Sequence, residues 1–288
     1  MLDREYLYRL IPDKLYLKLL FKRRLGKKLN LRSPKTFNEK LQWLKLYDRN
    51  PLYTTLVDKY LVKEYVAGII GEEFIIPTLG VWDNFDEIDF EKLPDRFVLK
   101  CTHDSGGVVI VEDKNAFDVD AARDKIKSRL KKNFYYPGRE WPYKNVKPRI
   151  IAEQYLEDLA FEHSPVDYKL MCFGGKVECS FTCTERFSGT GLKVTFFDKD
   201  WKAMPFERHY HKSDNPIKKP EKYAEMVQIA EKLSKGIPFV RVDLYEVKGH
   251  IYFGELTLYP GCGFEEFNPD EWDRKVGDWV PLDGAFGR

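Results

Sequence analysis

The chain has 288 residues and is nearly neutral, with a formal net charge of +2. This balance excludes a basic field over the whole protein of the kind that nucleic-acid binding requires, so no nucleic-acid partner is expected. No apolar run reaches the roughly 18–20 residues of a membrane span, and no signal peptide precedes the first predicted helix. We therefore expect a cytoplasmic protein of one large domain or two small ones.

The predicted elements begin with helical sequence that runs to about Tyr47. Thr36 and Glu39 form a capping-box pattern, and Phe37, Leu41 and Leu44 then recur at helical spacing. A second helix is predicted over residues 52–66. Three strands and a basic helix follow, over residues 74–82, 96–103, 108–112 and 119–133.

The second half of the chain is predicted to be mainly strands. A loop rich in Pro and aromatic residues is predicted for residues 139–147, and an amphipathic helix for residues 220–235. Strands and helices alternate without the regularity of βαβ units, which predicts an α+β fold with largely antiparallel sheets. The further strands are predicted at 149–156, 168–173, 176–184 and 192–197, and in a hairpin within 239–261.

The chain has five cysteines, of which Cys172, Cys179 and Cys183 fall in one predicted strand–turn–strand. Their spacing does not match that of zinc sites, and no histidine pair completes a ligand set. We expect small buried side chains, with neither zinc nor a disulfide.

The hairpin near the C-terminus brings two carboxylates together. Lys248-Gly249 is typical of the turn, and folding back at it places Asp243 and Glu255 on adjacent strands. Because side chains alternate along a strand, Arg241 shares a face with Asp243, and Thr257 shares one with Glu255. Such oxygen ligands beside a guanidinium can hold Mg²⁺ that also takes up phosphate oxygens. The alternative is a cross-strand polar pair on a solvated face.

A glycine-containing turn follows a lysine at the end of an apolar predicted strand. Lys100 is followed by Ser105, Gly106 and Gly107, and then by another strand. Glycines let a backbone approach phosphate closely, and exposed N–H groups in such a turn bind anions, while the lysine adds a point charge. The turn is neither a Walker loop nor a dinucleotide fingerprint, and an ordinary hairpin turn remains the alternative.

The order of these motifs along the chain resembles that of the ATP-grasp superfamily, which includes D-alanine–D-alanine ligases and carboxylases. A closer similarity is to its TupA-like branch, named for teichuronopeptide synthesis and found in surface-polysaccharide gene clusters. The similarity extends over nearly the whole chain from about residue 20. The segments that carry it are Thr36-Phe-Asn-Glu-Lys-Leu-Gln-Trp43, Cys101-Thr-His-Asp-Ser-Gly-Gly107, Asp167-Tyr-Lys169 and Phe264-Glu-Glu-Phe-Asn-Pro269.

The resemblance implies a fold of two α/β subdomains with largely antiparallel sheets around a nucleotide. We expect a helical N-terminal segment over residues 1–50 and an ATP-grasp domain over residues 51–288. Its subdomains are expected at about 70–150, with the glycine turn, and at about 151–288, with the metal. We expect only a short helical segment ahead of Lys59, in place of the Rossmann-like domain that usually precedes the nucleotide site in such ligases, which suggests a large, open acceptor.

The resemblance also implies that ATP and Mg²⁺ bind, and it assigns residues to the nucleotide. Lys59 and Lys100 would contact the α- and β-phosphates, with Ser105, Gly106 and Gly107 covering them. The remaining nucleotide contacts would be an adenine hinge at Glu153, Tyr155 and Leu156, and a ribose contact at Asp167.

For the metal and the reaction, the resemblance implies that Asp243 and Glu255 link Mg²⁺ to the β- and γ-phosphates. Thr257 stands where the family usually has Asn, and its hydroxyl can still coordinate the ion, although a second metal is then in doubt. Arg241 would steady the transferring group, Lys169 would contact phosphate, and Arg186 would bind the donor carboxylate or form a surface ion pair.

The function implied is a carboxylate–amine ligase that activates an acid as an acyl phosphate and adds an amine to it. We expect a uronic acid of a bacterial surface polysaccharide as the acid and an amino acid or other amine as the donor. The alternatives are a kinase that phosphorylates a sugar, a glycosyltransferase, as members of the branch are often called, and a nucleotide-binding regulatory module. His103 and Asp104 either handle the amine proton or form a turn-capping Asp beside a solvent-facing His.

The run from Lys14 to Arg32 is basic and rich in leucine. A peripheral contact with the inner face of the membrane would suit an enzyme that acts on lipid-linked glycans. On a helical wheel the charges do not separate cleanly from Leu17, Leu20 and Leu25, so a solvated helix packed on the domain is the alternative.

Overall fold

The computed structural model describes residues 8–156, 166–185 and 191–282, which fold as two compact units. One unit comprises residues 1–49 with 166–288, and the other comprises residues 50–165. The division predicted from the sequence set residues 1–50 apart and placed a boundary near residue 150. Among the described residues, 8–49 group with the C-terminal unit, and residues 50–156 form the other unit.

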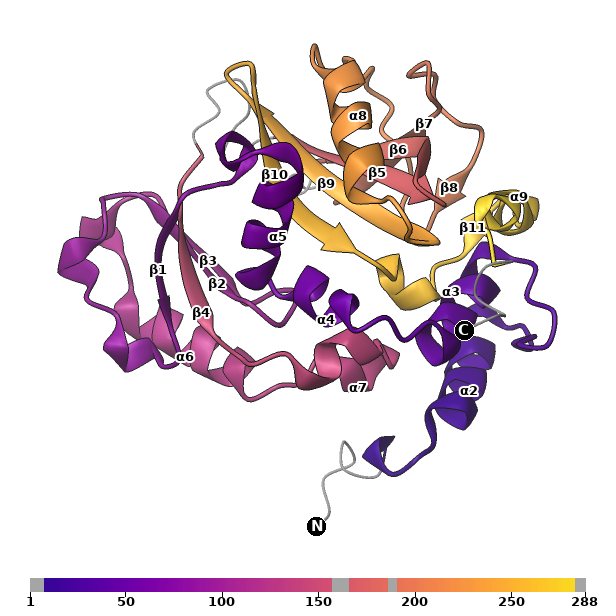
Figure 1. Ribbon diagram of the computed structural model, residues 1–288, viewed down its shortest axis with the longest axis horizontal. Helices are drawn as coiled ribbons and strands as arrows, with labels where there is room; N and C mark the ends of the chain where they lie inside the picture. The colour runs from indigo at the N-terminus through magenta and orange to yellow at the C-terminus, as the bar shows by residue number, and fades with distance from the viewer. Residues whose placement is uncertain (1–7, 157–165, 186–190, 283–288) are drawn as a thin grey trace. The chain divides into compact units, whose positions relative to one another are not determined.

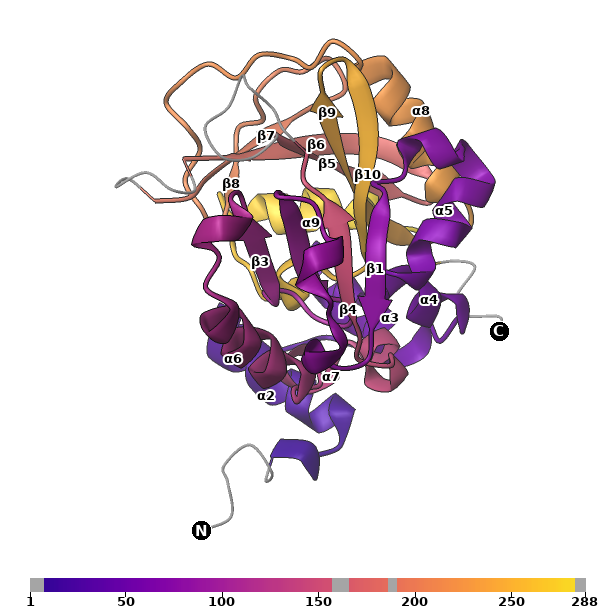
Figure 2. The ribbon, with the colours of Figure 1, turned by 90° about the vertical axis from the view of Figure 1, so that its left-hand side faces the viewer.

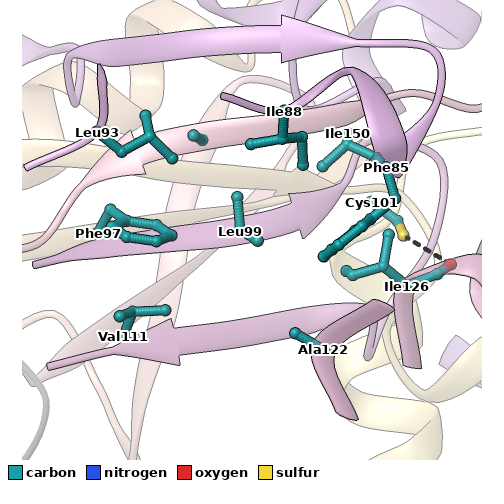
Figure 3. Close-up of a cluster of buried hydrophobic side chains, with 11 residues drawn as sticks. Phe85, Ile88, Leu93, Phe97, Leu99, Cys101, Val111, Ala122, Ile126 and Ile150 are labelled. Carbon is teal, nitrogen blue, oxygen red and sulfur yellow. Dashed lines mark hydrogen bonds between the residues drawn. The ribbon is translucent and has the colours of Figure 1, made fainter. Parts of the chain in front are cut away.

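The unit of residues 50–165 is built on a four-stranded antiparallel sheet of order β1-β4-β2-β3 (Figure 2). Along β2, Phe97, Leu99 and Cys101 are buried on one face, against Ala122 and Ile126 of helix α6 (Figure 3). Because side chains alternate along a strand, Lys100 of β2 points to the other face. The elements are β1 (Thr78–Trp82), β2 (Phe97–Cys101), β3 (Val108–Val111), β4 (Ile150–Gln154) and α6 (Val119–Leu130).

The prediction of a single helix over residues 52–66 is wrong, because two helices occupy this stretch. Helix α4 is Leu52–Val57 and helix α5 is Leu61–Ile70. Between them Asp58 accepts hydrogen bonds from the backbone N–H groups of Tyr60 and Leu61, at 2.9 and 3.3 Å. An aspartate that accepts from the following N–H groups ends one helix and begins the next.

Short 3₁₀ and α-helical turns account for most other differences from the prediction in this unit. The strand predicted from residue 74 begins only at Thr78, because Glu72–Phe74 forms a 3₁₀ turn. The loop predicted for residues 139–147 contains the 3₁₀ turn η5. The short elements are η1 (Glu72–Phe74), η2 (Phe85–Glu87), η3 (Phe90–Lys92), η4 (Lys114–Ala116), η5 (Trp141–Asn145) and α7 (Tyr135–Gly138).

The other unit contains a five-stranded antiparallel sheet of order β10-β9-β5-β6-β7. Helix α8 (Tyr223–Leu233) lies along one face of this sheet (Figure 1) and contacts β5, β6 and β9. The opposite face carries the charged side chains described below. The strands are β5 (Asp167–Phe173), β6 (Lys176–Thr184), β7 (Lys193–Phe197), β9 (Phe239–Val247) and β10 (His250–Thr257); β8 (Glu207–Arg208) pairs separately with β11 (Phe267–Asn268).

Helix α3 (Phe37–Tyr47) joins the N-terminal segment to this unit. The predicted capping box is confirmed, since the Thr36 side chain accepts from Glu39 N and the Glu39 side chain accepts from Thr36 N. The Phe37 ring lies 4.9 Å from the Phe239 ring and 6.1 Å from the Phe173 ring, measured between centroids. Burial of aromatic rings against β9 and β5 explains why the N-terminal residues are part of this unit.

Two of the segments that carry the family resemblance meet in the structure. The 3₁₀ turn η6 (Pro260–Gly263) contains two consecutive left-handed residues, Gly261 and Cys262. Gln42 Nε2 donates to the carbonyl of Gly263 at 2.7 Å, and Lys45 Nζ donates to that of Cys262 at 2.7 Å. Asn38 Nδ2 donates to the carbonyl of Glu265 at 2.8 Å. Polar side chains of α3 therefore hold the chain that follows β10. The other helices of this unit are α2 (Asp13–Leu25) and α9 (Glu271–Trp279).

Candidate functional site

The sheet register brings three of the predicted residues side by side. Asp243 on β9 is directly opposite Glu255 on β10 and, on its other side, directly opposite Lys169 on β5. Arg241 is opposite Thr257. The predicted hairpin is confirmed, with its turn at Lys248-Gly249, where both residues have positive φ as a two-residue hairpin turn requires.

A β-bulge at Gly254 sets the register at this point. Phe253 pairs with Leu244, and the next paired residue on β10 is Glu255, opposite Asp243, so Gly254 is the extra residue. A Cβ added to Gly254 would lie 2.9 Å from the Tyr245 ring and 3.1 Å from the Asp243 carbonyl oxygen. Glycine therefore fits a position that few other residues could occupy.

Arg241 connects the two carboxylates of the hairpin. Its Nε donates to Asp243 Oδ1 at 2.6 Å, and its Nη2 donates to Asp243 Oδ2 at 2.7 Å and to Glu255 Oε1 at 2.8 Å. Lys169 Nζ donates to Asp243 Oδ2 at 2.5 Å and also to the carboxylate of Asp167. Thr257 Oγ1 donates to Glu255 Oε1 at 3.1 Å. We call Asp167, Lys169, Arg241, Asp243 and Glu255 the acidic cluster.

Burial differs across the acidic cluster. The Asp243 side chain is 2% exposed, whereas that of Glu255 is 40% exposed. Burial raises the pKa of Asp243, while Arg241 and Lys169 oppose that shift. Burial acts to lower the pKa of Lys169, but the carboxylates of Asp167 and Asp243 outweigh it and raise that pKa. The same carboxylates with Glu255 raise the pKa of Arg241. Both cations are thus held in their charged forms.

The donor set fits a divalent cation bound together with an anionic ligand. The acidic cluster has three carboxylates and two cations, and Asp167 Oδ1 is buried with no hydrogen-bond partner among the described residues. Asp243 Oδ1 accepts one hydrogen bond, so it keeps a lone pair for a further contact. In the part of the chain that the structure describes, no group of three or more His, Cys, Asp or Glu side chains is arranged as a metal site. Mg²⁺ here would need Asp243, Glu255, Thr257 and oxygens from a ligand.

The unit of residues 50–165 has a different charged group. Glu153 on β4 forms ion pairs with Lys63 of α5 and with Lys100 of β2, the latter at 2.5 Å. The side chains of Lys63 and Lys100 are 11% and 21% exposed, and that of Glu153 is 6% exposed. We call these three residues the lysine cluster. Lys63 was not assigned a role from the sequence, although it lies four residues after Lys59, which was.

Two opposing effects act on the lysine cluster. Burial acts to raise the pKa of Glu153, but the charges of Lys100 and Lys63 outweigh burial and lower it. For Lys63, burial is the larger effect and lowers its pKa in spite of Glu153. With two lysines beside one carboxylate, the cluster has an excess of cationic side chains, which suits an anionic ligand.

The glycine turn after Lys100 is held by side chains rather than left as a loose hairpin turn. Asp104 Oδ1 accepts from Gly107 N at 3.2 Å, while Asp104 Oδ2 accepts from Arg129 Nε at 2.5 Å. A Cβ added to Gly107 would lie 2.8 Å from Cys101 Sγ. Lys59 Nζ donates to the Asp104 carbonyl at 2.5 Å, so Lys59 lies against this turn and not in the lysine cluster.

His103 does not face solvent as one alternative expected. It is 2% exposed, and its Nε2 lies 3.1 Å from the Lys132 carbonyl and 3.3 Å from the Arg129 carbonyl. Carbonyl oxygens only accept, so Nε2 carries the proton. Burial lowers the pKa of His103, which favours this neutral form. The other half of that alternative, Asp104 as the cap of the turn, is confirmed.

The remaining predicted residues are placed as follows. Tyr155 Oη donates to Glu112 at 3.1 Å, and Leu156, half-buried, ends the described part of that segment. Gly106 has a φ of 124° in the glycine turn, and the Ser105 carbonyl accepts from Arg129 at 2.9 Å. Arg186 lies outside the described residues. The ligand contacts assigned to all of these side chains stay predictions.

The chain belongs to the TupA-like ATP-grasp family, whose model matches residues 39–281. The predicted family and the predicted α+β ATP-grasp fold are therefore confirmed. No curated protein matches the sequence.

The chain is also similar to several solved structures, at low sequence identity. A D-alanine–D-alanine ligase from Bacillus anthracis, complexed with ATP, is 16% identical with a TM-score of 0.44, over 81% of this chain and 65% of the ligase. A RimK domain ATP-grasp protein from Sphaerobacter thermophilus is 13% identical with a TM-score of 0.42, over 81% and 70%. A D-alanine–D-alanine ligase from Helicobacter pylori is 13% identical with a TM-score of 0.46, over 86% and 68%. The chain thus spans less than two thirds of the length of the first of these ligases.

Proposed function

We propose that the chain is an ATP- and Mg²⁺-dependent carboxylate–amine ligase that forms an amide through an acyl phosphate. The observation that carries the proposal is the acidic cluster, in which Asp243 and Glu255 face each other across two strands with Arg241 bound to both. Two like charges placed opposite each other destabilise a hairpin unless cations neutralise them. Arg241 and Lys169 supply such cations, and the third carboxylate of the acidic cluster leaves one negative charge for a metal ion.

The lysine cluster and the glycine turn supply groups for the phosphates of ATP. Lys100 is a point charge with 21% of its side chain exposed, and Lys63 lies beside the same carboxylate. The turn from Asp104 to Gly107 is braced by Arg129, so its backbone is ordered before any ligand arrives. Ordered donors lower the entropic cost of binding.

Asp243, Glu255 and Thr257 would hold Mg²⁺. The ion, when bound, neutralises negative charge on phosphate oxygens. The chain's own cations do the same work beside it: Arg241 and Lys169 are held charged and fixed by hydrogen bonds before reaction. Electrostatic stabilisation by groups that need no reorganisation is a large contribution to phosphoryl transfer.

The proposed reaction balances without a side-chain nucleophile. A carboxylate oxygen of the acid forms a bond to the γ-phosphorus of ATP, the bond from that phosphorus to the β–γ bridging oxygen breaks, and ADP leaves. The amine nitrogen of the second substrate then attacks the acyl carbon of the acyl phosphate. The C–O bond to phosphate breaks, phosphate leaves, and the amine gives up a proton to water as the amide forms.

The substrate class rests on the resemblance to the teichuronopeptide branch. We propose a uronic acid of a bacterial surface polysaccharide as the acid and an amino acid or another amine as its partner, reacting in the cytoplasm. Such an acid carries one carboxylate per sugar, which is the group that this chemistry activates.

The test is to incubate the full chain with ATP, Mg²⁺ and polymeric or monomeric uronic acids, with and without amines, and to follow ADP, AMP and phosphate. We expect ADP and phosphate, and a hydroxamate when hydroxylamine replaces the amine, because it traps an activated acid. Glu255→Gln should abolish both, whereas Glu221→Gln, a matched change at an exposed site in the same unit, should not. A stable phosphorylated sugar formed without amine would establish a kinase instead, and AMP as product would exclude an acyl phosphate.

A further inference from the structure

Helix α2 and the residues just before it expose large apolar side chains that the fold leaves uncovered. Only Leu17 and Phe21 of this helix are buried. Leu10, Leu15 and Leu19 are 80%, 51% and 57% exposed, and Tyr8 is 48% exposed. These four are the most exposed large hydrophobic side chains of the described residues, and they fall within one short stretch. Leu15 and Leu19 are four residues apart, so they lie together on the outer face of the helix.

Cations accompany these leucines. Of residues 13–28, seven are Lys or Arg and only Asp13 is acidic, a net charge of +6. Because the whole chain carries +2, the residues outside this stretch carry −4. Lys14, Lys18 and Lys22 follow one edge of the leucine face at helical spacing. Their side chains form no ion pair with a described residue, whereas Lys27 pairs with Asp270. The positive charge of the protein is concentrated here.

A hollow of about 430 Å³ lies beside the same helix. Lys14 and Lys18 of α2 line it together with Arg32 and Tyr47, and Tyr47 is 46% exposed. Three cations around a hollow with an aromatic wall suit a phosphate group attached to an apolar body. A soluble anion would use the cations but would leave Leu15 and Leu19 in water.

We propose that α2 is a docking helix for the surface of an anionic phospholipid bilayer. In this arrangement Leu15 and Leu19 enter the boundary between headgroups and acyl chains, and Lys14, Lys18 and Lys22 contact lipid phosphates. An apolar strip flanked by cations is the pattern of helices that lie in a membrane interface. No helix among the described ranges is long and apolar enough to cross a bilayer, which agrees with a surface contact.

The charge on this face argues against two other occupants. A second copy of the chain, placed symmetrically on α2, would bring two stretches of +6 together, which repel each other. Nucleic acid would neutralise the cations, but its phosphate backbone offers no apolar layer for the leucines. The bilayer is the occupant that satisfies both the charge and the exposed apolar surface.

The test is sedimentation of the full chain with vesicles of phosphatidylcholine alone or mixed with phosphatidylglycerol. We expect binding at least about tenfold stronger to the mixed vesicles, decreasing as salt is added. The assay needs no turnover, so its result is independent of the proposed ligase reaction.

Two double variants separate the contributions of charge and of apolar surface. Lys14→Gln with Lys18→Gln and Leu15→Gln with Leu19→Gln should each reduce binding to the mixed vesicles about tenfold, with melting temperatures unchanged because the four side chains are exposed. Lys125→Gln with Lys131→Gln removes the same charge from exposed positions in and next to α6 and should leave binding unchanged.

Three results would overturn the proposal. One is equal binding to vesicles with and without phosphatidylglycerol. Another is full binding by the leucine variant, which would reduce the contact to non-specific charge attraction. The third is release of the protein by inorganic phosphate at matched ionic strength, which would make the hollow a site for a soluble anion.

Discussion

The acidic cluster and the lysine cluster are both buried networks of carboxylates and cations, but they differ in which charge is in excess. In the lysine cluster one carboxylate, Glu153, faces two lysines. In the acidic cluster three carboxylates surround Arg241 and Lys169. The charges of each network balance except for one, which is positive in the lysine cluster and negative in the acidic cluster. The excess positive charge of the lysine cluster suits an anionic group such as phosphate, and the excess negative charge of the acidic cluster suits a cation.

The largest expected effect on turnover comes from removing one negative charge from the acidic cluster. Glu255→Gln leaves two carboxylates against two cations and removes a metal ligand. Turnover should drop by about 10²–10³-fold or more, as when an electrostatic contact to the transferring group is lost. Because the Glu255 side chain is 40% exposed, the unfolding midpoint in urea should change little. Full turnover in this variant would separate the acidic cluster from catalysis.

The second prediction concerns stability in the lysine cluster. Glu153→Gln leaves Lys63 and Lys100 close together without a carboxylate, so the unfolding free energy should decrease by about 3 kcal/mol. Urea denaturation measures this change, and Glu221→Gln serves as the exposed control. Unchanged stability would show that the two lysines move apart into solvent and that the cluster is not a buried network.

The third prediction compares the two clusters as ligand sites. ATP with Mg²⁺ should stabilise the chain by about 2.7 kcal/mol at a hundredfold excess over its dissociation constant. Lys100→Gln should weaken ATP binding about tenfold with or without Mg²⁺, because it removes one charge-assisted contact. Glu255→Gln should weaken binding only when Mg²⁺ is present. Calorimetric titrations of ATP with and without EDTA measure these affinities. If Mg²⁺ changed the ATP affinity of both variants equally, the assignment of Lys100 to phosphate and of Glu255 to the metal would be contradicted.

The smallest expected effect is a pH dependence of the contribution that Glu153 makes to the unfolding free energy. The pKa of Glu153 in the folded chain lies below its ordinary value of 4.5, because the lysines outweigh burial. Its stabilising contribution is therefore complete above pH 4.5 and is lost as pH falls through the folded pKa. The difference in unfolding free energy between the native chain and Glu153→Gln should narrow below pH 4.5 and stay constant above it. A difference that does not vary with pH would exclude ionised Glu153 as its source.

Sequence patterns predicted what short-range interactions determine. The hairpin of β9 and β10 and the capping box of α3 were both predictable, because a two-residue turn and a side chain three residues away act within one segment. The break between α4 and α5 was missed because hydrophobic spacing continued across it. Asp58 was the residue that could have indicated this break, since aspartate is commonly found at the start of a helix.

Contacts between segments that are far apart in the sequence could not be predicted from local sequence patterns. The Lys169 contact with Asp243 depends on β5 pairing with β9, which joins residues 74 positions apart. Lys63 meets Glu153 through an ion pair between α5 and β4, which are far apart in the sequence. The family resemblance supplied Lys169, but neither spacing nor composition indicated Lys63 as the second cation of Glu153.

The extra residue at Gly254 also determines where this hairpin can change length. Apolar side chains occupy odd positions before it, at Ile251 and Phe253, and even positions after it, at Leu256 and Leu258. A one-residue insertion or deletion elsewhere in β10 would turn Glu255 toward the opposite face of the sheet. Removal of Gly254 itself would leave Phe253 opposite Leu244 and Glu255 opposite Asp243 in an uninterrupted ladder. The strand thus has a single position at which it can lose a residue over evolutionary time and still keep its two carboxylates face to face.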